Sequence, residues 1–153
     1  MKFDYCLGNP AYQNETLGDN EGFAPPVYNK FLDEAYKVSD KVEMIHPARF
    51  LFNAGSTPKA WNNKMLNDEH FKVLRYEADS SKVFSNTDIK GGVVISYHDS
   101  QQNFGAIEIF TPDVLLNHVL KKVKNSSSFS SISPIVITRT AYRLTKKLHE
   151  DFP

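Results

Sequence analysis

The sequence predicts an α/β fold whose sheet is mostly parallel and closed by a C-terminal antiparallel strand pair. Apolar segments of strand length alternate with segments whose apolar residues recur at helical spacing. The last two strand-like segments, residues 91–99 and 103–110, are joined by a turn of only a few polar residues. Such alternation is typical of parallel sheets with helices on both faces, and the short turn favours a hairpin at the end.

The first elements follow from apolar spacing and from proline. Residues 2–7 form an apolar run that Gly8 ends, which predicts a short buried strand. After Pro25-Pro26, apolar residues recur at helical spacing over residues 27–38, with Pro26 suited to the first turn. The predicted buried face of this helix is the set Val27, Phe31, Ala35 and Val38.

The later elements follow in the same way. Residues 41–46 predict a strand that Pro47 ends, and residues 47–56 a loop. Thr57-Pro58 predicts the N-cap and first turn of a helix through about Leu66. Further strands are predicted over residues 71–78, 91–99 and 103–110, and a helix over residues 113–124 behind Thr111-Pro112.

Length and composition bound the class of protein. The chain has 153 residues, of which 41% are hydrophobic and 24% charged, as expected for one ordinary globular domain. No apolar stretch approaches the roughly 20 residues of a membrane span, and the N-terminus lacks the features of a secretory signal. These observations predict a cytoplasmic protein with no membrane partner. The lone Cys6 excludes a disulfide within the chain.

Charge divides the chain unevenly. Residues 1–113 carry 11 basic and 16 acidic side chains, net −5, whereas residues 114–153 carry 7 and 2, net +5. Residues 126–134 form a serine-rich linker, and residues 135–153 predict a basic amphipathic helix. This asymmetry indicates either a segment that faces nucleic acid or a solvated basic helix.

The tetrad Asn9-Pro10-Ala11-Tyr12 follows the first predicted strand and carries the clearest chemistry. The Asn9 side-chain oxygen and the Pro10 backbone carbonyl are two adjacent acceptors that match the two hydrogens of an exocyclic amine. The Tyr12 ring could stack on the face of the same planar ligand. Ligands in open α/β sheets bind beyond the carboxyl ends of strands, where this tetrad lies, although Asn-Pro is also a routine turn.

The stretch FDYCLGNPAYQ resembles the GNPPYQ signature of methyltransferases that act on adenine in DNA, in particular the restriction-modification methylases of the type II group. The resemblance continues through FAPPVYNKFLDEAYKVSDKVEMIHPARFLFNAG, TPKAWNNKMLNDEHFKVL and DSSKVFSNTDIKGGVVISY, and covers about residues 2–110. It implies that residues 1–125 are the C-terminal half of a catalytic domain with a partial class I methyltransferase (Rossmann-like) sheet. Residues 135–153 would then begin a target-recognition region.

The resemblance implies a substrate and roles for five residues. The substrate would be double-stranded DNA with an adenine flipped out of the duplex. Asn9 and Pro10 would hold its N6 amino group, and Tyr12 would stack on the base. Phe84 would cover the other face of the base, or else be an ordinary core residue. Arg49 could face a DNA phosphate, although pairing with a surface acid is an equal alternative.

Two departures from the family pattern matter. The family usually has proline where this sequence has Ala11, which permits the loop conformation without imposing it. The glycine-rich loop and the acidic residue that hold S-adenosylmethionine precede the tetrad in the family and are not in this sequence. We therefore expect that this chain alone binds no S-adenosylmethionine and transfers no methyl group. We also expect a complementing N-terminal half, or a homodimer, to pair with the exposed first strand.

Two other functions stay open at this point. The chain could be a noncatalytic module that binds nucleic acid or a protein partner through its basic tail. It could also belong to the Asn-Pro-x-Tyr methyltransferases that act on glutamine side chains, which the extended resemblance disfavours. The five histidines are scattered along the sequence and predict no metal site.

Overall fold

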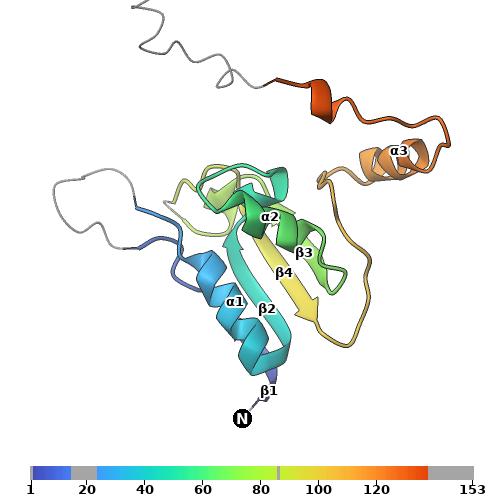
Figure 1. The fold of residues 1–153 in the computed structure, drawn as a ribbon. Helices are drawn as coiled ribbons and strands as arrows, with labels where there is room; N and C mark the ends of the chain where they lie inside the picture. The colour runs from blue at the N-terminus through green and yellow to red at the C-terminus, as the bar shows by residue number, and fades with distance from the viewer. Residues whose placement is uncertain (1, 15–23, 86, 138–153) are drawn as a thin grey trace, which may run out of the picture. The chain divides into compact units, whose positions relative to one another are not determined.

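The computed structural model describes residues 2–14, 24–85 and 87–137, which form two compact units, Met1–Pro112 and Asp113–Pro153 (Figure 1). The described part of the first unit contains four strands and two α-helices. These elements are β1 (Phe3–Gly8), α1 (Tyr28–Val38), β2 (Ser39–Pro47), α2 (Lys59–Leu66), β3 (Phe71–Glu77) and β4 (Val93–Asp99). Two short 3-10 helices, η1 (Arg49–Phe52) and η2 (Ser80–Lys82), lie in the connections. The α/β class is thus confirmed.

The sheet is mixed, with strand order β1-β2-β4-β3. β1 pairs with β2 in parallel, whereas β4 is antiparallel to both of its neighbours. β1, β2 and β3 therefore run in one direction and only β4 is reversed. Because β4 lies between β2 and β3, two of the three pairings are antiparallel, and the prediction of a mostly parallel sheet is wrong at the level of pairing.

The predicted strand over residues 103–110 is also wrong. This segment leaves β4 and is held to the β3 side of the unit by single backbone bonds, from Phe104 N to Glu69 O and from Glu108 N to Leu66 O, both 2.7 Å. Gly105 and Glu108 have φ angles of +80° and +53°, which break an extended backbone. The antiparallel pair near the end of the sheet is instead β3 with β4.

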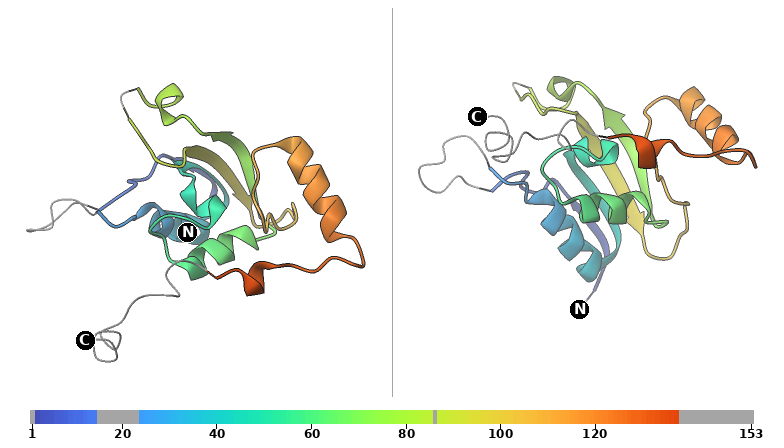
Figure 2. Two further views of the ribbon diagram at one scale, coloured as in Figure 1. Left: turned by 90° about the horizontal axis from the view of Figure 1, so that it is seen from above. Right: turned by 45° about the horizontal axis from the view of Figure 1, so that its top comes forward.

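The two helices cover one face of the sheet, with α1 and α2 in front of β2 and β4 (Figures 1 and 2). On this helix-covered face, Val42, His46 and Val94 are buried. The opposite face, which carries Lys41 and Glu43 on β2, is at least partly exposed to solvent. Within the described residues of the first unit, helices therefore cover one face and not the predicted two.

The core between helices and sheet is largely aromatic. Phe50 has no exposed surface, and its ring lies 5.2 Å from that of Trp61 and 6.2 Å from that of Phe71, measured between centroids. Tyr28 meets the ring of Trp61 edge to face at 6.0 Å. Such edge-to-face contacts are the favoured geometry of aromatic pairs. η1 thus inserts Phe50 at the centre of the core.

Two local predictions need correction. α1 buries Tyr28, Leu32 and Ala35, whereas Phe31 is 48% exposed and Val38 41% exposed, so the buried face is turned by about one residue from the predicted one. At α2 the N-cap position belongs to Pro58, and the Thr57 hydroxyl donates to the Asn62 side chain at 2.6 Å instead of capping the helix.

The second unit contains α3 (Val114–Lys124), which confirms the predicted helix after Thr111-Pro112. The Asp113 carboxylate caps α3 by accepting from the backbone N–H groups of Leu115 and Leu116. A 3-10 turn, η3 (Ser133–Ile135), follows the serine-rich stretch. The predicted helix over residues 135–153 lies almost wholly outside the described residues. Across the described part of the chain, no helix is both long and apolar enough to cross a membrane.

Candidate base-binding site

The tetrad Asn9-Pro10-Ala11-Tyr12 leaves the carboxyl end of β1, as predicted. Its position is fixed by backbone contacts with the segment that leads into α1. The Val27 N–H donates to the Tyr12 carbonyl at 3.1 Å, and the Asn14 N–H donates to the Pro25 carbonyl at 3.0 Å. The loop is therefore tied at its far end to the start of α1, although Ala11 replaces a conformationally fixed proline.

The structure brings Tyr12 and Phe84 together. Their ring centroids are 6.3 Å apart with an interplanar angle of 66°, an edge-to-face contact. Phe84 follows η2, where its N–H donates to the Ser80 carbonyl at 2.8 Å. Residues far apart in the sequence thus place two aromatic rings beside the end of β1.

The Tyr12 hydroxyl is a buried polar group that has no hydrogen-bond partner among the described residues. Burial raises the pKa of this hydroxyl, and the neighbouring Asn9 side chain opposes the rise. An unpaired buried hydroxyl costs free energy unless a ligand or water completes it. The Asn9 side chain and the Tyr12 hydroxyl therefore form a small polar group with unused hydrogen-bonding capacity.

A cavity of about 620 Å³ opens next to this group, at the carboxyl ends of β1 and β2. That volume lies within the usual range for a small-molecule or base site. Of the five predicted site residues, Tyr12 and Arg49 line the cavity, whereas Asn9, Pro10 and Phe84 are not part of its lining. The remaining described lining is Gln13, Ala24, Pro26, Tyr28, Pro47, Gly55, Ser56, Thr57, Thr87, Asp88, Ile89 and Lys90.

Tyr28 also lines the cavity, and His46 lies against its ring. Burial raises the pKa of Tyr28 to about 12, and a contact with the Thr57 hydroxyl opposes the rise. The Tyr28 ring stacks on the His46 ring at 5.5 Å and 16°. His46 is fully buried on β2, and its Nε2 lies 2.8 Å from the Ser96 hydroxyl of β4. The sheet thus supports Tyr28 in the cavity lining through a buried polar stack.

Known proteins resemble this chain in sequence. Residues 1–84 match the Eco57I restriction-modification methylase family. The chain belongs to this family. All five predicted site residues fall within the matched segment.

A curated relative supports membership of the Eco57I methylase family. The chain is 32% identical over 107 residues to an "Uncharacterized adenine-specific methylase" of Mycoplasma pneumoniae. The alignment covers 68% of this chain but only 25% of the relative, so the chain spans about a quarter of that protein's length. No solved structure matches the chain. The resemblance to restriction-modification methylases seen in the sequence is confirmed.

Sequence patterns missed Tyr28 and Thr57, which line the cavity, and His46, whose ring stacks on Tyr28 behind it. Tyr28 and His46 lie in segments that the sequence assigns to a helix and a strand, where a core role is the default. Thr57 is predicted only as a helix cap. The pairing of β2 with β4 brings His46 and Ser96 together, and that pairing could not be predicted from local sequence.

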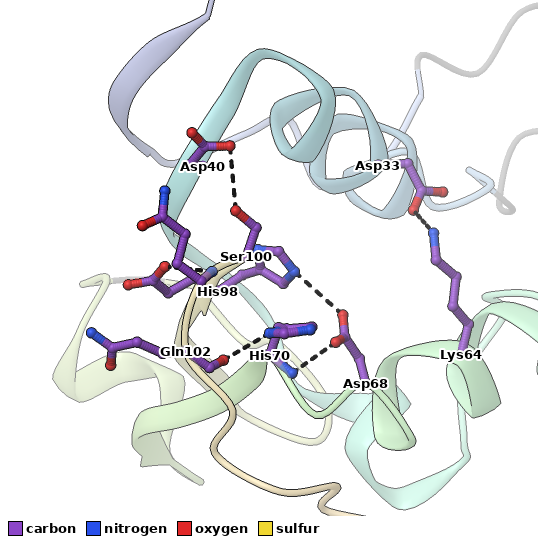
Figure 3. Close-up of polar contacts among 10 residues, drawn as sticks. Asp33, Asp40, Lys64, Asp68, His70, His98, Ser100 and Gln102 are labelled. Atoms are coloured by element: carbon purple, nitrogen blue, oxygen red, sulfur yellow. Dashed lines mark hydrogen bonds and ion pairs between the residues drawn. The ribbon is translucent and has the colours of Figure 1, made fainter.

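A second cluster lies around the other end of β4, where His98 and His70 meet Asp68 (Figure 3). The His98 Nε2 lies 3.5 Å from an Asp68 carboxylate oxygen, and the His70 Nδ1 lies 2.7 Å from the Gln102 carbonyl. Burial lowers the pKa of His98, with Asp68 acting in the opposite direction. Within the part of the chain that the structure describes, no group of three or more side chains is suited to hold a metal ion.

Proposed function

We propose that this Eco57I-family chain supplies the adenine-binding part of a site-specific DNA adenine-N6 methyltransferase that uses S-adenosylmethionine. One observation carries the proposal. The tetrad leaves the carboxyl end of β1 beside a cavity of about 620 Å³, with Tyr12 in its wall and Phe84 against Tyr12. The combination provides acceptors for an amine and aromatic faces for a base at one place.

The proposed chemistry assigns a role to each group of the tetrad. The adenine N6 donates its two hydrogens to the Asn9 side-chain oxygen and to the Pro10 carbonyl. These bonds hold the nitrogen lone pair away from the ring system, where it can attack a methyl group. Tyr12 stacks on one face of the flipped base and Phe84 on the other. Because the two rings now meet edge to face, one of them has to turn when the base enters.

The described glycines Gly55, Gly91 and Gly92 do not form an open seat for S-adenosylmethionine. A glycine-lined seat needs open space beside a glycine, but a Cβ at Gly91 would collide with Arg49, and one at Gly92 would lie 2.3 Å from the Glu77 carbonyl oxygen. Gly55 also faces the Arg49 side chain at close range. We therefore propose that the methyl donor is held outside the described residues and that this chain alone is inactive.

The edge strand β1 supports a proposed partner. Phe3, Tyr5 and Leu7 of β1 are 55%, 46% and 69% exposed, and within the described residues β1 pairs with a strand on one side only. Apolar edges of this kind pair readily with another chain. We propose that a complementing half of the methyltransferase or a second copy adds a strand to β1.

Sedimentation of the purified chain tests the proposed association through β1. We expect a mass above the 17.4 kDa of one chain at high concentration. Leu7→Lys places a charge on the edge and should shift the chain toward the monomer. A wild-type chain that sediments as a clean monomer contradicts association with a second copy and leaves the complementing half as the proposed partner.

A competition between two oligonucleotides tests the base-binding proposal. Both are single-stranded thymine tracts, one with a single adenine and the other with purine, which lacks the exocyclic amine. Because thymine has no exocyclic amine, the adenine N6 is the only one offered, and a single strand requires no unpairing. Two hydrogen bonds worth roughly 0.5–1.5 kcal/mol each predict a preference for adenine of about tenfold. Asn9→Ala should remove most of it, and Asn63→Ala, an exposed asparagine of α2, should not.

α3 favours a second candidate function, a noncatalytic module that binds nucleic acid. Its last turns carry Lys121, Lys122 and Lys124, and its apolar residues Leu115 and Val119 are exposed. A salt-dependent affinity for DNA that vanishes on deletion of residues 114–153, which removes α3 together with the basic tail, and that ignores Asn9→Ala would favour this module.

A further inference from the structure

The Arg49 side chain is held by two glycines at the rim of the cavity. A Cβ at Gly91 would lie 2.3 Å from the Arg49 Cγ, and one at Gly55 would lie 3.2 Å from the Arg49 Cβ. Both glycines have positive φ angles, +89° and +86°, so other residues are disfavoured there on backbone grounds as well. The stem of Arg49 therefore passes through a slot that only glycines leave open.

The guanidinium at the end of this stem faces the cavity. Arg49 lines the cavity together with Tyr12 and Tyr28, and its positive charge favours the ionised form of Tyr28, although burial has the larger effect on that pKa. None of the ion pairs or side-chain hydrogen bonds found among the described residues involves Arg49. The alternative of pairing with a surface acid therefore finds no support in the described part of the chain.

Among the described residues, the rim also carries Lys90, the residue before Gly91, and the carboxylate Asp88. The three charges leave this described part of the rim net positive. An arginine fork matches the oxygens of a phosphate group in a bidentate manner, which a lysine cannot do. The two glycines thus hold the planar guanidinium of Arg49 where it can bind an anion at the mouth of the cavity.

Building on the proposed function, we propose that Arg49 binds a phosphodiester group of the nucleic acid beside the flipped adenine, with Lys90 adding positive charge. The glycines Gly55 and Gly91 position Arg49 for this contact. The substrate is then adenine within a nucleic acid chain. A protein glutamine side chain offers an amide but no phosphate, so this rim separates the two substrate classes.

Salt titrations with an abasic oligonucleotide test the phosphate contact without the base. The full chain is mixed with a labelled single strand in which one nucleotide lacks its base, and the affinity is followed by fluorescence anisotropy. Arg49→Gln should weaken binding roughly fivefold to tenfold at low salt and make the slope of log affinity against log salt shallower by about 0.7. Gly91→Ala should produce a similar loss because its Cβ displaces Arg49. The matched control Arg75→Gln removes an exposed arginine of β3 and should change neither quantity.

The outcomes separate this proposal from the proposed function. Asn9→Ala should leave the salt slope unchanged, because Asn9 is assigned to the base and not to the backbone. If adenine is not preferred over purine but Arg49→Gln still makes the slope shallower, the phosphate contact stands and the base assignment falls. Equal slopes for Arg49→Gln and Arg75→Gln overturn the phosphate contact, whatever the adenine preference. Arg49→Gln leaves the glycines unchanged, so the test does not depend on the folding of Gly91→Ala.

Discussion

Phe50→Ala is expected to destabilise the first unit by about 3–5 kcal/mol, a loss at the upper end for truncation of one core side chain. Phe50 is fully buried and contacts the rings of Trp61, Phe71 and Tyr28, so truncation leaves a cavity at the centre of the core. The loss is measured as the fall in the free energy of unfolding in urea. Since Tyr28 lines the cavity that we propose to bind the base, affinity for oligonucleotides should also fall.

Phe31→Ala provides the matched control. Phe31 lies on α1 and is 48% exposed, so its truncation should change the free energy of unfolding by roughly 0.5 kcal/mol or less. Similar losses for the two variants would mean that the buried face of α1 is the one predicted from apolar spacing and not the observed one.

Acid should destabilise the chain through His46. Burial lowers the pKa of His46 from 6.5 to about 4, so the folded state favours the neutral ring more than the unfolded state does. Stability from this group is complete above pH 6.5 and is lost as the pH falls toward 4. Between pH 7.5 and pH 5 the expected loss is about 2 kcal/mol. Urea unfolding at the two pH values measures it.

His46→Phe separates this group from the other titrating residues. The variant keeps a ring to stack on Tyr28, and the Ser96 hydroxyl retains the Met44 carbonyl as an acceptor at 3.4 Å. Between pH 7.5 and pH 5, the free energy of unfolding of this variant should therefore fall by about 2 kcal/mol less than the free energy of unfolding of the wild type does. His98, whose pKa burial also lowers, remains in both proteins and contributes equally. An unchanged pH dependence in His46→Phe would exclude His46 as the cause.

Local sequence was sufficient for most elements of the fold. The apolar run before Gly8, the proline at the end of β2 and Thr111-Pro112 before α3 each act within a few residues. The prediction that the first strand is buried is wrong, because β1 lies at the edge of the sheet and is largely exposed. The predicted face of α1 is turned by about one residue because apolar residues stand at both spacings: Tyr28 and Leu32 are buried, whereas Phe31 is not. Residues 103–110 are apolar enough for a strand, but Gly105 and Glu108 take conformations that no ladder accommodates.

Long-range arrangement could not be predicted from local patterns. The position of β4 between β2 and β3 depends on contacts among strands that are far apart in the sequence. This position creates the His46–Ser96 contact. The slot for Arg49 likewise requires Gly91 to approach from the far end of the β3–β4 connection. The proposed base-binding groups could be predicted from the sequence because Asn9, Pro10 and Tyr12 lie within four consecutive residues. The contribution of Tyr28 to the cavity could not be predicted in this way.

The central claim is that the tetrad recognises the exocyclic amine of adenine. The most direct measurement is the affinity ratio between the adenine and purine thymine tracts, for the wild type and for Asn9→Ala. A ratio of about ten that falls toward one in Asn9→Ala supports the claim. Equal affinities of the wild-type chain for the two oligonucleotides, or a preference that survives Asn9→Ala, would contradict it.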